Sequence, residues 1–473
     1  MIGSTGRPIL NSLTRQGQLH AAIVMIVAVG YAFIFRAHGA PWLWTAVWTL
    51  GLSLSAVAAH RPECGLAAYA VILYSTPRYE QLFNRLFESN LLHVAVLSTT
   101  VGAALWMSKE GRSWRLTTPL VALASALFGW FCLSWLFADP DARGATAILQ
   151  NPRHSLGFLF DAFVMLGIAS QVMDRQGAGR WLILPLAVGL TIRILWQGLD
   201  GLRLEGDIGP LLVMLLPLFL LLAEIDANGL VKLSMVAAAL GVLPTVAVTY
   251  NRASAVAIGA VFLYLCWRYR RNIWILGATA VCIVAAAFWL TNSPYRGRFQ
   301  EAWRELKGVE VGSVSQRLDL WRAGFAIAID HPVVGVGPGG YASETRLYST
   351  TLHGTLVAHN NYVQVAAETG FPGLALYLAL FGTALASAAR ATGQSAHDWR
   401  GATAGALQVS IVGYLTAGLF ISRHDMVLAY MLVGWIAATA SAAAVERQEV
   451  GFISRREAAG AASSHRRDPR SPV

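Results

Sequence analysis

The sequence predicts an all-α polytopic integral membrane protein with about 12–14 transmembrane helices and one long extracytoplasmic loop that contains amphipathic helices. The chain is 55% hydrophobic and 13% charged, and its apolar residues come in blocks about as long as a bilayer-spanning helix. Polar residues are concentrated in one interval, residues 292–370. The net charge of +10 comes from short basic clusters between the apolar blocks. Such clusters are typical of cytoplasmic anchors and argue against nucleic-acid binding.

Fourteen apolar blocks are candidates for membrane spans. We expect the first block to be a retained span, because no small-residue cleavage site follows it. The block near 65–76 is short, and a twelve-span count results if one early pair is re-entrant or interfacial. The blocks lie near residues 19–35, 41–59, 65–76, 90–108, 117–137, 156–173, 181–199, 208–224, 232–248, 252–267, 273–291, 371–390, 402–421 and 425–445.

Basic segments between the blocks predict the orientation. If the spans alternate, five basic segments lie on one side, which the positive-inside bias assigns to the cytoplasm. They are residues 109–115, 174–180, 267–272, 390–400 and the tail from 447. The same parity gathers four segments on the far side: residues 138–155, 198–207, 249–254 and 292–370.

This pattern divides the chain into four parts. Residues 1–291 are expected to form the N-terminal transmembrane helices, and residues 292–370 the far-side loop with the catalytic elements. Residues 371–446 are expected to form the C-terminal transmembrane helices. Residues 447–473 read as a basic, disordered cytoplasmic tail.

The far-side loop contains two predicted helices that flank a glycine-rich turn. The first, residues 315–331, has one apolar face that we expect to pack on the protein, with Arg317 and Arg322 outside that face. That face is formed by Leu318, Trp321, Phe325 and Ile329. The second helix places His359 and Asn360 at its start, where both side chains can point at a ligand.

Arginines recur on the far side, where the positive-inside bias disfavours them: Arg203, Arg252 and Arg317, with Arg193 about two turns inside the preceding span. An arginine at membrane depth costs about 2.5–3.5 kcal/mol on insertion scales, so something should compensate for it. A phosphate or pyrophosphate would do so, because guanidinium binds phosphate oxygens in a bidentate fork. The alternative is that these arginines reach lipid headgroups or pair with nearby acids. Those acids are Glu205, Asp207 and Asp319.

His359 is the candidate general base, because the pKa of histidine lets it accept a proton from a hydroxyl near neutral pH. The alternative is a histidine that only caps the helix or is exposed. His331 and His353 compete for the same role, although the proline after His331 indicates a turn that ends a helix. The role of Glu368 stays open.

No cofactor or metal is expected. The D-x-D pattern formed by Asp139 and Asp141 is common in turns, and the histidines do not form close pairs of metal ligands. The glycines of GVGPGGY are not followed by the lysine of a nucleotide-binding phosphate loop. The energy for any reaction must therefore arrive with the substrate.

Four segments resemble the signature blocks of the bacterial O-antigen ligase and O-antigen polymerase superfamily, with O-antigen ligase favoured. Their order around one far-side loop is more specific than any block alone, and the resemblance spans roughly Arg203 to Phe420. One departure is Asn251, where the family often has serine before the arginine. The segments are TYNRAS at 249–254, the spacing of Ser315, Arg317 and Trp321, DHPVVGVGPGGY at 330–341 and HNNYVQVAAETGFPG at 359–373.

The resemblance implies a multi-pass glycosyltransferase of the bacterial inner membrane that uses neither metal nor nucleotide. Such enzymes transfer a glycan from undecaprenyl pyrophosphate to an acceptor hydroxyl on the periplasmic face. Position by position, Arg252 and Arg317 match the arginines thought to hold the pyrophosphate, and His359 matches the proposed base. Arg203 is added to the pyrophosphate site from topology alone.

The resemblance leaves the acceptor open. A ligase transfers the glycan to lipid A core, a polymerase transfers it to another glycan, and a protein O-glycosylation ligase transfers it to serine or threonine. A different class is a transporter of lipid-linked glycans, in which charges would lie inside the spans rather than in a loop. A purely structural role explains neither the far-side charges nor the amphipathic loop.

Overall fold

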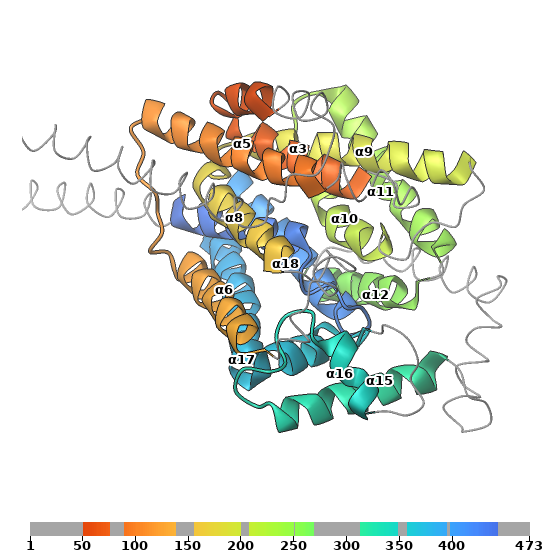
Figure 1. Cartoon of the computed structure of the whole chain (residues 1–473). Helices are drawn as coiled ribbons and strands as arrows, with labels where there is room; N and C mark the ends of the chain where they lie inside the picture. The colour runs from red at the N-terminus through yellow and green to blue at the C-terminus, as the bar shows by residue number, and fades with distance from the viewer. Residues whose placement is uncertain are drawn as a thin grey trace, which may run out of the picture.

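The fold is described from a computed structural model of the whole chain (Figure 1). Within the described residues the chain forms α-helices and turns and no strand, so the predicted all-α class is confirmed. The described residues are 51–75, 89–138, 156–199, 208–249, 251–268, 313–348, 357–394 and 398–442.

The labelled helices follow the predicted blocks closely. They are α3 (Pro62–Ser75), α5 (Ser89–Lys109), α6 (Pro119–Phe137), α8 (Leu156–Val172), α9 (Ala178–Leu199), α10 (Ile208–Ile225), α11 (Gly229–Val248), α12 (Arg252–Arg268), α15 (Ser313–Asp330), α16 (Tyr341–Tyr348), α17 (Asn361–Gln394) and α18 (Trp399–Ala417). A further apolar helix covers Val427–Ala442.

Among the described residues, five helices are long and apolar enough to cross a membrane. They are α6, α10, α11, the Ala178–Leu195 part of α9 and the Asn361–Gly393 part of α17. Four shorter apolar stretches also coincide with predicted spans: Pro62–Tyr74, Leu159–Val172, Ala253–Trp267 and Val427–Ala442. The predicted spans near 19–35 and 273–291, and the start of the one near 41–59, lie outside the described residues. The total number of spans therefore stays a prediction.

Local sequence sets where several helices begin. Thr118 accepts a hydrogen bond from the backbone N–H of Val121, and Pro119 follows at the first helical position of α6. Asn228 and Asp398 cap α11 and α18 in the same way. Each side chain satisfies backbone donors that have no partner inside the helix.

Helix α10 forms the centre of the bundle. In its apolar stretch 78% of the residues are buried, against 28% in α11 at the periphery. It packs against α9, α11, α12 and α18, which surround it in Figure 1. A helix that is apolar on all sides suits this central position.

Two of the predicted basic segments meet at one end of the bundle. Arg112, after α5, donates to the Asp174 carboxylate after α8, with a shortest N–O distance of 2.8 Å. The neighbouring Arg175 pairs with Glu63 at the start of α3 at 2.6 Å. The segments 109–115 and 174–180 therefore share one end, as the alternation of spans requires.

Helices α15 and α16 and the first turns of α17 form a separate layer at the bottom of Figure 1. Its small core contains Leu320, Ile327, Val336, Tyr341, Ala358, Val363 and Ala367, with Trp321 and Tyr348 packed against it. This layer joins the two predicted loop helices and the glycine-rich turn into one unit.

The prediction for the packed face of α15 was correct for Trp321, which packs against the small core, and wrong for Leu318, Phe325 and Ile329, which are exposed. Phe325 and Ile329 are more than half exposed, whereas Leu320 and Ile327 on the opposite face are buried. The reason is the close approach of α17: a Cβ on Gly324 would lie 2.4 Å from a side-chain carbon of Val363. Small residues on this face let the two helices pack tightly, and that contact outweighs the larger apolar side chains opposite.

Helix α17 is bent at Gly370, which has a φ of 69° and a ψ of −177°. The predicted span from 371 therefore begins just after the bend, and the helical segment before the bend begins at Asn361. Helix α18 ends at Ala417, four residues before the predicted end at 421. The Gly418 carbonyl there accepts a hydrogen bond from the backbone N–H of Asn361 at 2.7 Å, which ties the two helix ends together.

Candidate functional site

His359 lies in a tight turn directly before α17, and it is the non-glycine residue with positive φ, 51°, within the described chain. This left-handed region is uncommon for residues with a Cβ and persists where surrounding contacts determine it. Here Asn360 caps α17, because its side-chain oxygen accepts hydrogen bonds from the backbone N–H groups of Tyr362 and Val363. The His359 side chain is half-buried. The turn therefore holds the candidate base on a fixed backbone.

Trp321 of α15 reaches this turn. Its indole Nε1–H donates to the backbone carbonyl of Ala358 at 2.9 Å. Arg317 lies four residues earlier on the same helix, and residues at that spacing are neighbours on one helix face. The half-buried Arg317 is thus one turn of helix from the residue that contacts the His359 turn. The structure brings these two predicted site residues into one layer.

The glycine-rich turn supports the same layer from the other side. The backbone N–H of Gly337 donates to the carbonyl of Glu368 at 2.8 Å, and that of Val336 donates to Ala367 at 3.0 Å. A Cβ on Gly335, which has a φ of 67°, would lie 2.3 Å from the backbone of Glu368. Glycine is required there because the two backbones touch. The segment read from sequence as a tight turn is therefore a docking element for α17.

Two tyrosines hold α16 and α15 together. Burial raises the pKa of the Tyr341 hydroxyl well above its ordinary value, so it stays protonated and donates to the Leu320 carbonyl at 2.6 Å. Partial burial and a hydrogen bond to Asp330 raise the pKa of Tyr348 to about 12. Both hydroxyls act as permanent donors at neutral pH.

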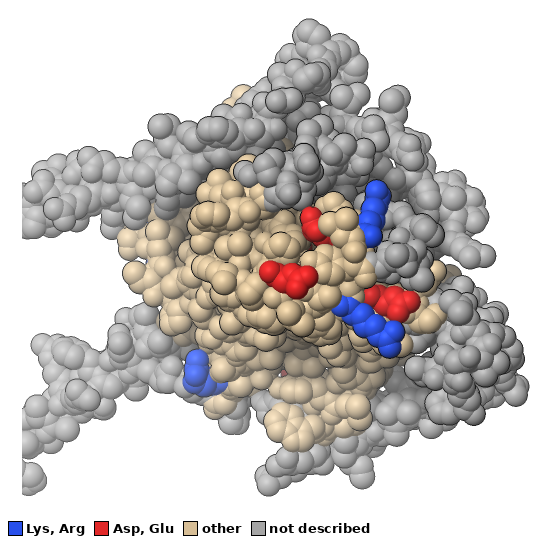
Figure 2. All heavy atoms as spheres, turned by 60° about the horizontal axis from the view of Figure 1, so that its bottom comes forward, with Lys and Arg blue, Asp and Glu red and all other residues tan. Residues whose placement is uncertain are grey.

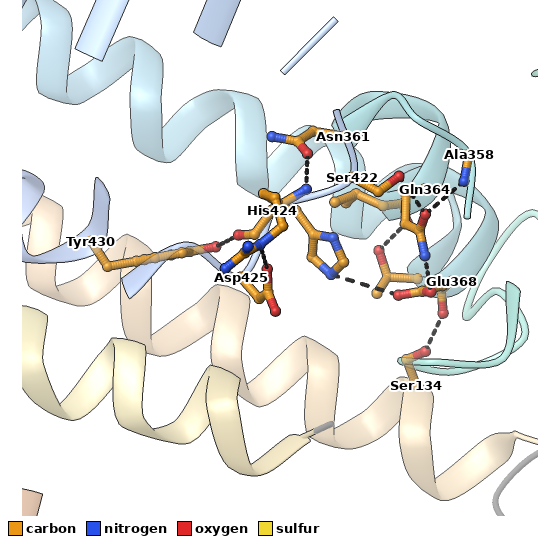
Figure 3. A network of polar contacts seen from close by, with 12 residues as sticks. Ser134, Ala358, Asn361, Gln364, Glu368, Ser422, His424, Asp425 and Tyr430 are labelled. Carbon is orange, nitrogen blue, oxygen red and sulfur yellow. Dashed lines mark hydrogen bonds and ion pairs between the residues drawn. The ribbon is translucent and has the colours of Figure 1, made fainter. Parts of the chain in front are cut away.

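A buried polar network lies behind the His359 turn (Figure 3). Its centre is Glu368, whose carboxyl group accepts a hydrogen bond from the Gln364 amide at 2.6 Å and lies 3.6 Å from Nε2 of His424. Ser422 donates to the Gln364 oxygen at 2.8 Å, and Ser134 of α6 donates to the Glu368 backbone carbonyl at 2.7 Å. The network joins α6, α17 and the segment after α18.

Sequence reasoning left the role of Glu368 open and did not single out Gln364, Ser422 or His424. A signal was present for the first pair, because Gln364 and Glu368 are four residues apart and so share one face of α17. For Ser422 and His424 no comparable signal exists, since they are about sixty residues away in sequence and only the folded chain brings them together.

The structure describes less of the other two predicted arginines, Arg252 and Arg203. Arg252 begins α12, directly after Asn251, whose side-chain oxygen accepts from the backbone N–H of Ala253 at 2.9 Å. The side chain of Arg252 and the whole of Arg203 lie outside the described residues. The Arg252 segment packs beside the start of α10, where Gly209 contacts Ser254. That the side chains of Arg252 and Arg203 lie close to Arg317 and His359 stays a prediction.

Figure 2 shows the face that carries the lower layer of Figure 1. Charged side chains of the described residues are few there, and most of the surface that these residues form is uncharged. On α15, the Arg322 side chain is 80% exposed and pairs with Asp319 at 3.2 Å. This arginine is therefore exposed and compensated by a neighbour, in contrast to the half-buried Arg317 on the same helix.

The fold and this site define a polytopic α-helical membrane protein with a compact polar layer at one region of its bundle. Residues 236–378 match the family model Wzy_C, described as O-antigen ligase. The match covers less than a third of the chain, confirms the resemblance seen in the sequence and places this segment in the O-antigen ligase superfamily.

The matched segment contains Arg252, Arg317 and His359, whereas Arg203 lies before it. It also ends at residue 378, before the predicted limit near Phe420. No curated protein matches the chain at a significant level. The family match supports glycosyl transfer of the O-antigen ligase type in general.

Proposed function

We propose that this protein transfers a glycan from undecaprenyl pyrophosphate to an acceptor hydroxyl, with inversion at the sugar and without a metal ion. The observation that carries the proposal is the hydrogen bond from Trp321 to Ala358. It joins the Arg317 helix to the His359 turn inside the segment that matches the O-antigen ligase model. A phosphate-binding side chain and a base are the two groups that such a transfer needs.

In the proposed mechanism, a ring nitrogen of His359 accepts the proton of the acceptor hydroxyl. The acceptor oxygen attacks the anomeric carbon from the face opposite the leaving group, which inverts the configuration. The bond between this carbon and the pyrophosphate oxygen breaks, and its electron pair stays on the pyrophosphate. Arg252 and Arg317, with Arg203 as a third group, stabilise that charge. A preorganised cation at a leaving group is commonly among the largest catalytic contributions.

We place the reaction at the periplasmic face of the bacterial inner membrane. The basic segments 109–115 and 174–180 meet at one end of the bundle, and the positive-inside bias favours the cytoplasm for that end. The site then faces the periplasm, where a lipid-linked donor in the membrane and an acceptor can both approach it.

Lipid A core is the acceptor we favour, which makes the protein an O-antigen ligase of lipopolysaccharide biosynthesis. The description of the matching model supports this choice over the alternatives. Those alternatives are an O-antigen or exopolysaccharide polymerase and a protein O-glycosylation ligase. A transporter of lipid-linked glycan would form no covalent product at all.

The test is transfer by the purified full-length protein in liposomes, with EDTA present. The donor is an undecaprenyl-pyrophosphate glycan, supplied with lipid A core or with no added acceptor. We expect a product on lipid A core, and the variant His359→Ala to lower the rate by about 10²–10⁴-fold, the range typical of a lost general base. His331→Ala is the matched control, because His331 is an exposed histidine of the same loop.

The outcomes separate the alternatives. A lengthened carrier-linked glycan without lipid A core would identify a polymerase. A rate for His359→Ala close to that of the unmodified protein, at equal protein level, would show that His359 is not the base. Loss of transfer in EDTA, restored by a divalent metal, would contradict a metal-independent reaction, and no covalent product with any acceptor would favour transport.

A further inference from the structure

Ala358, the residue before His359, is held by two groups that come from different helices. Its backbone carbonyl accepts from the Trp321 indole at 2.9 Å, and its backbone N–H donates to Oε1 of Gln364 at 3.0 Å. Asn360, on the other side of His359, caps α17. Hydrogen bonds on both sides of His359 therefore fix its backbone. One of them is the hydrogen bond from the Ala358 N–H to Gln364 of α17.

The Gln364 amide can sit in only one orientation. Its oxygen faces two donors, the Ala358 N–H and the Ser422 hydroxyl, and its nitrogen faces an acceptor, the Glu368 carboxyl group. A flipped amide would place its NH₂ group against the Ala358 N–H and its oxygen against the carboxyl oxygen. The contact with Ala358 would then set two donors against each other, and the hydrogen bond that the amide donates to Glu368 would be lost. The Glu368 carboxyl group thus selects the amide orientation that holds the His359 turn.

Glu368 itself is fixed by its surroundings. Its side chain is fully buried, which is rare for glutamate unless specific partners surround it. Nε2 of His424 lies 3.6 Å from Oε2, and the backbone N–H groups of Gly339 and Tyr341 face the same carboxyl group. The glycine-rich turn, α17 and the segment after α18 therefore all meet at this carboxyl group.

We infer that Gln364 and Glu368 are positioning residues for the catalytic turn: Glu368 orients the Gln364 amide, and the amide fixes the backbone that presents His359. This inference rests on the proposed function, in which His359 is the base. Neither side chain needs to touch the substrate. Displacement of a catalytic group by about 1 Å can cost about 10²-fold in rate, so a contact of this kind can control turnover without changing donor binding.

The experiment measures kcat, the KM for the undecaprenyl-pyrophosphate donor, and the thermal midpoint of the full-length protein. Gln364→Met removes the three hydrogen bonds of the amide, to Ala358, Ser422 and Glu368, while preserving side-chain length. We expect kcat to fall by about 10- to 100-fold and the donor KM to stay within about twofold. Gln408→Met is the matched control, because Gln408 is a buried glutamine of α18 with one long hydrogen bond, 3.4 Å, to Leu385.

A charge exchange provides the rescue. Gln364→Glu alone places two carboxyl groups against each other, so kcat should fall as in Gln364→Met. In the double variant with Glu368→Gln, the amide at position 368 donates to the carboxylate at position 364. That carboxylate can still accept a hydrogen bond from the Ala358 N–H. We expect the double variant to recover kcat to within about threefold of the unmodified protein. This variant also decides the question if Gln364→Met does not fold.

Two results would overturn the inference: an unchanged kcat in Gln364→Met, with or without a raised donor KM, or no recovery in a double variant of normal thermal midpoint. The first would show that the amide does not act through the base. Failure of the proposed function is seen separately, because His359→Ala would then transfer glycan at the rate of the unmodified protein. In that case Gln364 and Glu368 would have no catalytic base to position, and the inference would be wrong as well.

Discussion

At the residue scale, the site depends on contrasts between similar side chains in one layer. Arg317 and Arg322 lie five residues apart on α15, yet Arg317 is half-buried and Arg322 is exposed beside Asp319. A phosphate ligand gains most from an arginine whose planar fork is held in place. Arg317 is therefore the arginine suited to bind the phosphates of the donor, whereas Arg322 faces solvent.

The first residue prediction concerns Arg317→Lys. Lysine keeps the positive charge but lacks the bidentate fork, so we expect kcat/KM for the lipid-linked donor to fall by about tenfold or more. Arg322→Lys should stay within about twofold, because an exposed ion pair contributes about 0–1 kcal/mol. Initial rates over a range of donor concentrations measure both. Equal losses in the two variants would show that only overall charge matters.

At the element scale, the bend in α17 sets the geometry of the site. Gly370 separates the segment that carries Asn361, Gln364 and Glu368 from the longer apolar segment after it. Pro332 accepts a hydrogen bond from the backbone N–H of Phe371 at 2.9 Å, so the glycine-rich turn is fastened at this bend. The bend lets one helix serve both as a membrane span and as part of the polar layer.

The element prediction follows from the space at Gly370. Its backbone conformation is one that residues with a Cβ rarely adopt, and a Cβ would lie 2.3 Å from the Val333 carbonyl oxygen. We expect Gly370→Ala to destabilise the protein by about 1–3 kcal/mol or more, and transfer to fall with it. The measurement is the thermal midpoint in detergent.

Gly382→Ala is the control for this prediction. Gly382 lies in the same helix with open space around its Cβ position, so alanine should leave the thermal midpoint unchanged or slightly raised. If both variants melted at the same temperature as the unmodified protein, the bend would not be an obligatory feature of the fold.

At the scale of the whole molecule, the two ends of the bundle differ in chemistry. One end carries arginine and carboxylate pairs that join the segment after α8 to the segment after α5 and to the start of α3. The layer of α15, α16 and the start of α17 instead carries the candidate base and a buried polar network. The positive-inside bias predicts a difference in charge between the two sides of a membrane protein.

The molecular prediction is a difference in accessibility between these regions. In a chain whose four native cysteines are replaced by serine, Glu110→Cys and His331→Cys place single thiols at exposed positions. In intact spheroplasts, a membrane-impermeant maleimide should label residue 331 at once and residue 110 only after permeabilisation. The measurement is the mass shift of the labelled chain. Labelling of both thiols before permeabilisation would contradict the proposed orientation.

The sequence by itself determined the fold class and most helix positions. Runs of apolar residues as long as α10 and α11 have no stable arrangement except as buried or membrane-spanning helices, so length and hydropathy suffice to find them. It also predicted Arg317 and His359 as site residues, Arg317 because an arginine on the far side of the membrane is disfavoured and His359 from its place at a helix start, and these roles stay predictions.

Tertiary structure alone decided how the polar layer is built. The packed face of α15 is the one with Gly324, not the one with Phe325 and Ile329, because backbone proximity to α17 depends on the partner helix. The meeting of Gln364 and Glu368 with Ser422 and His424 is likewise absent from any local pattern. Helix periodicity reports the neighbours of a residue within a few turns, whereas contacts between distant segments exist only after the chain has folded.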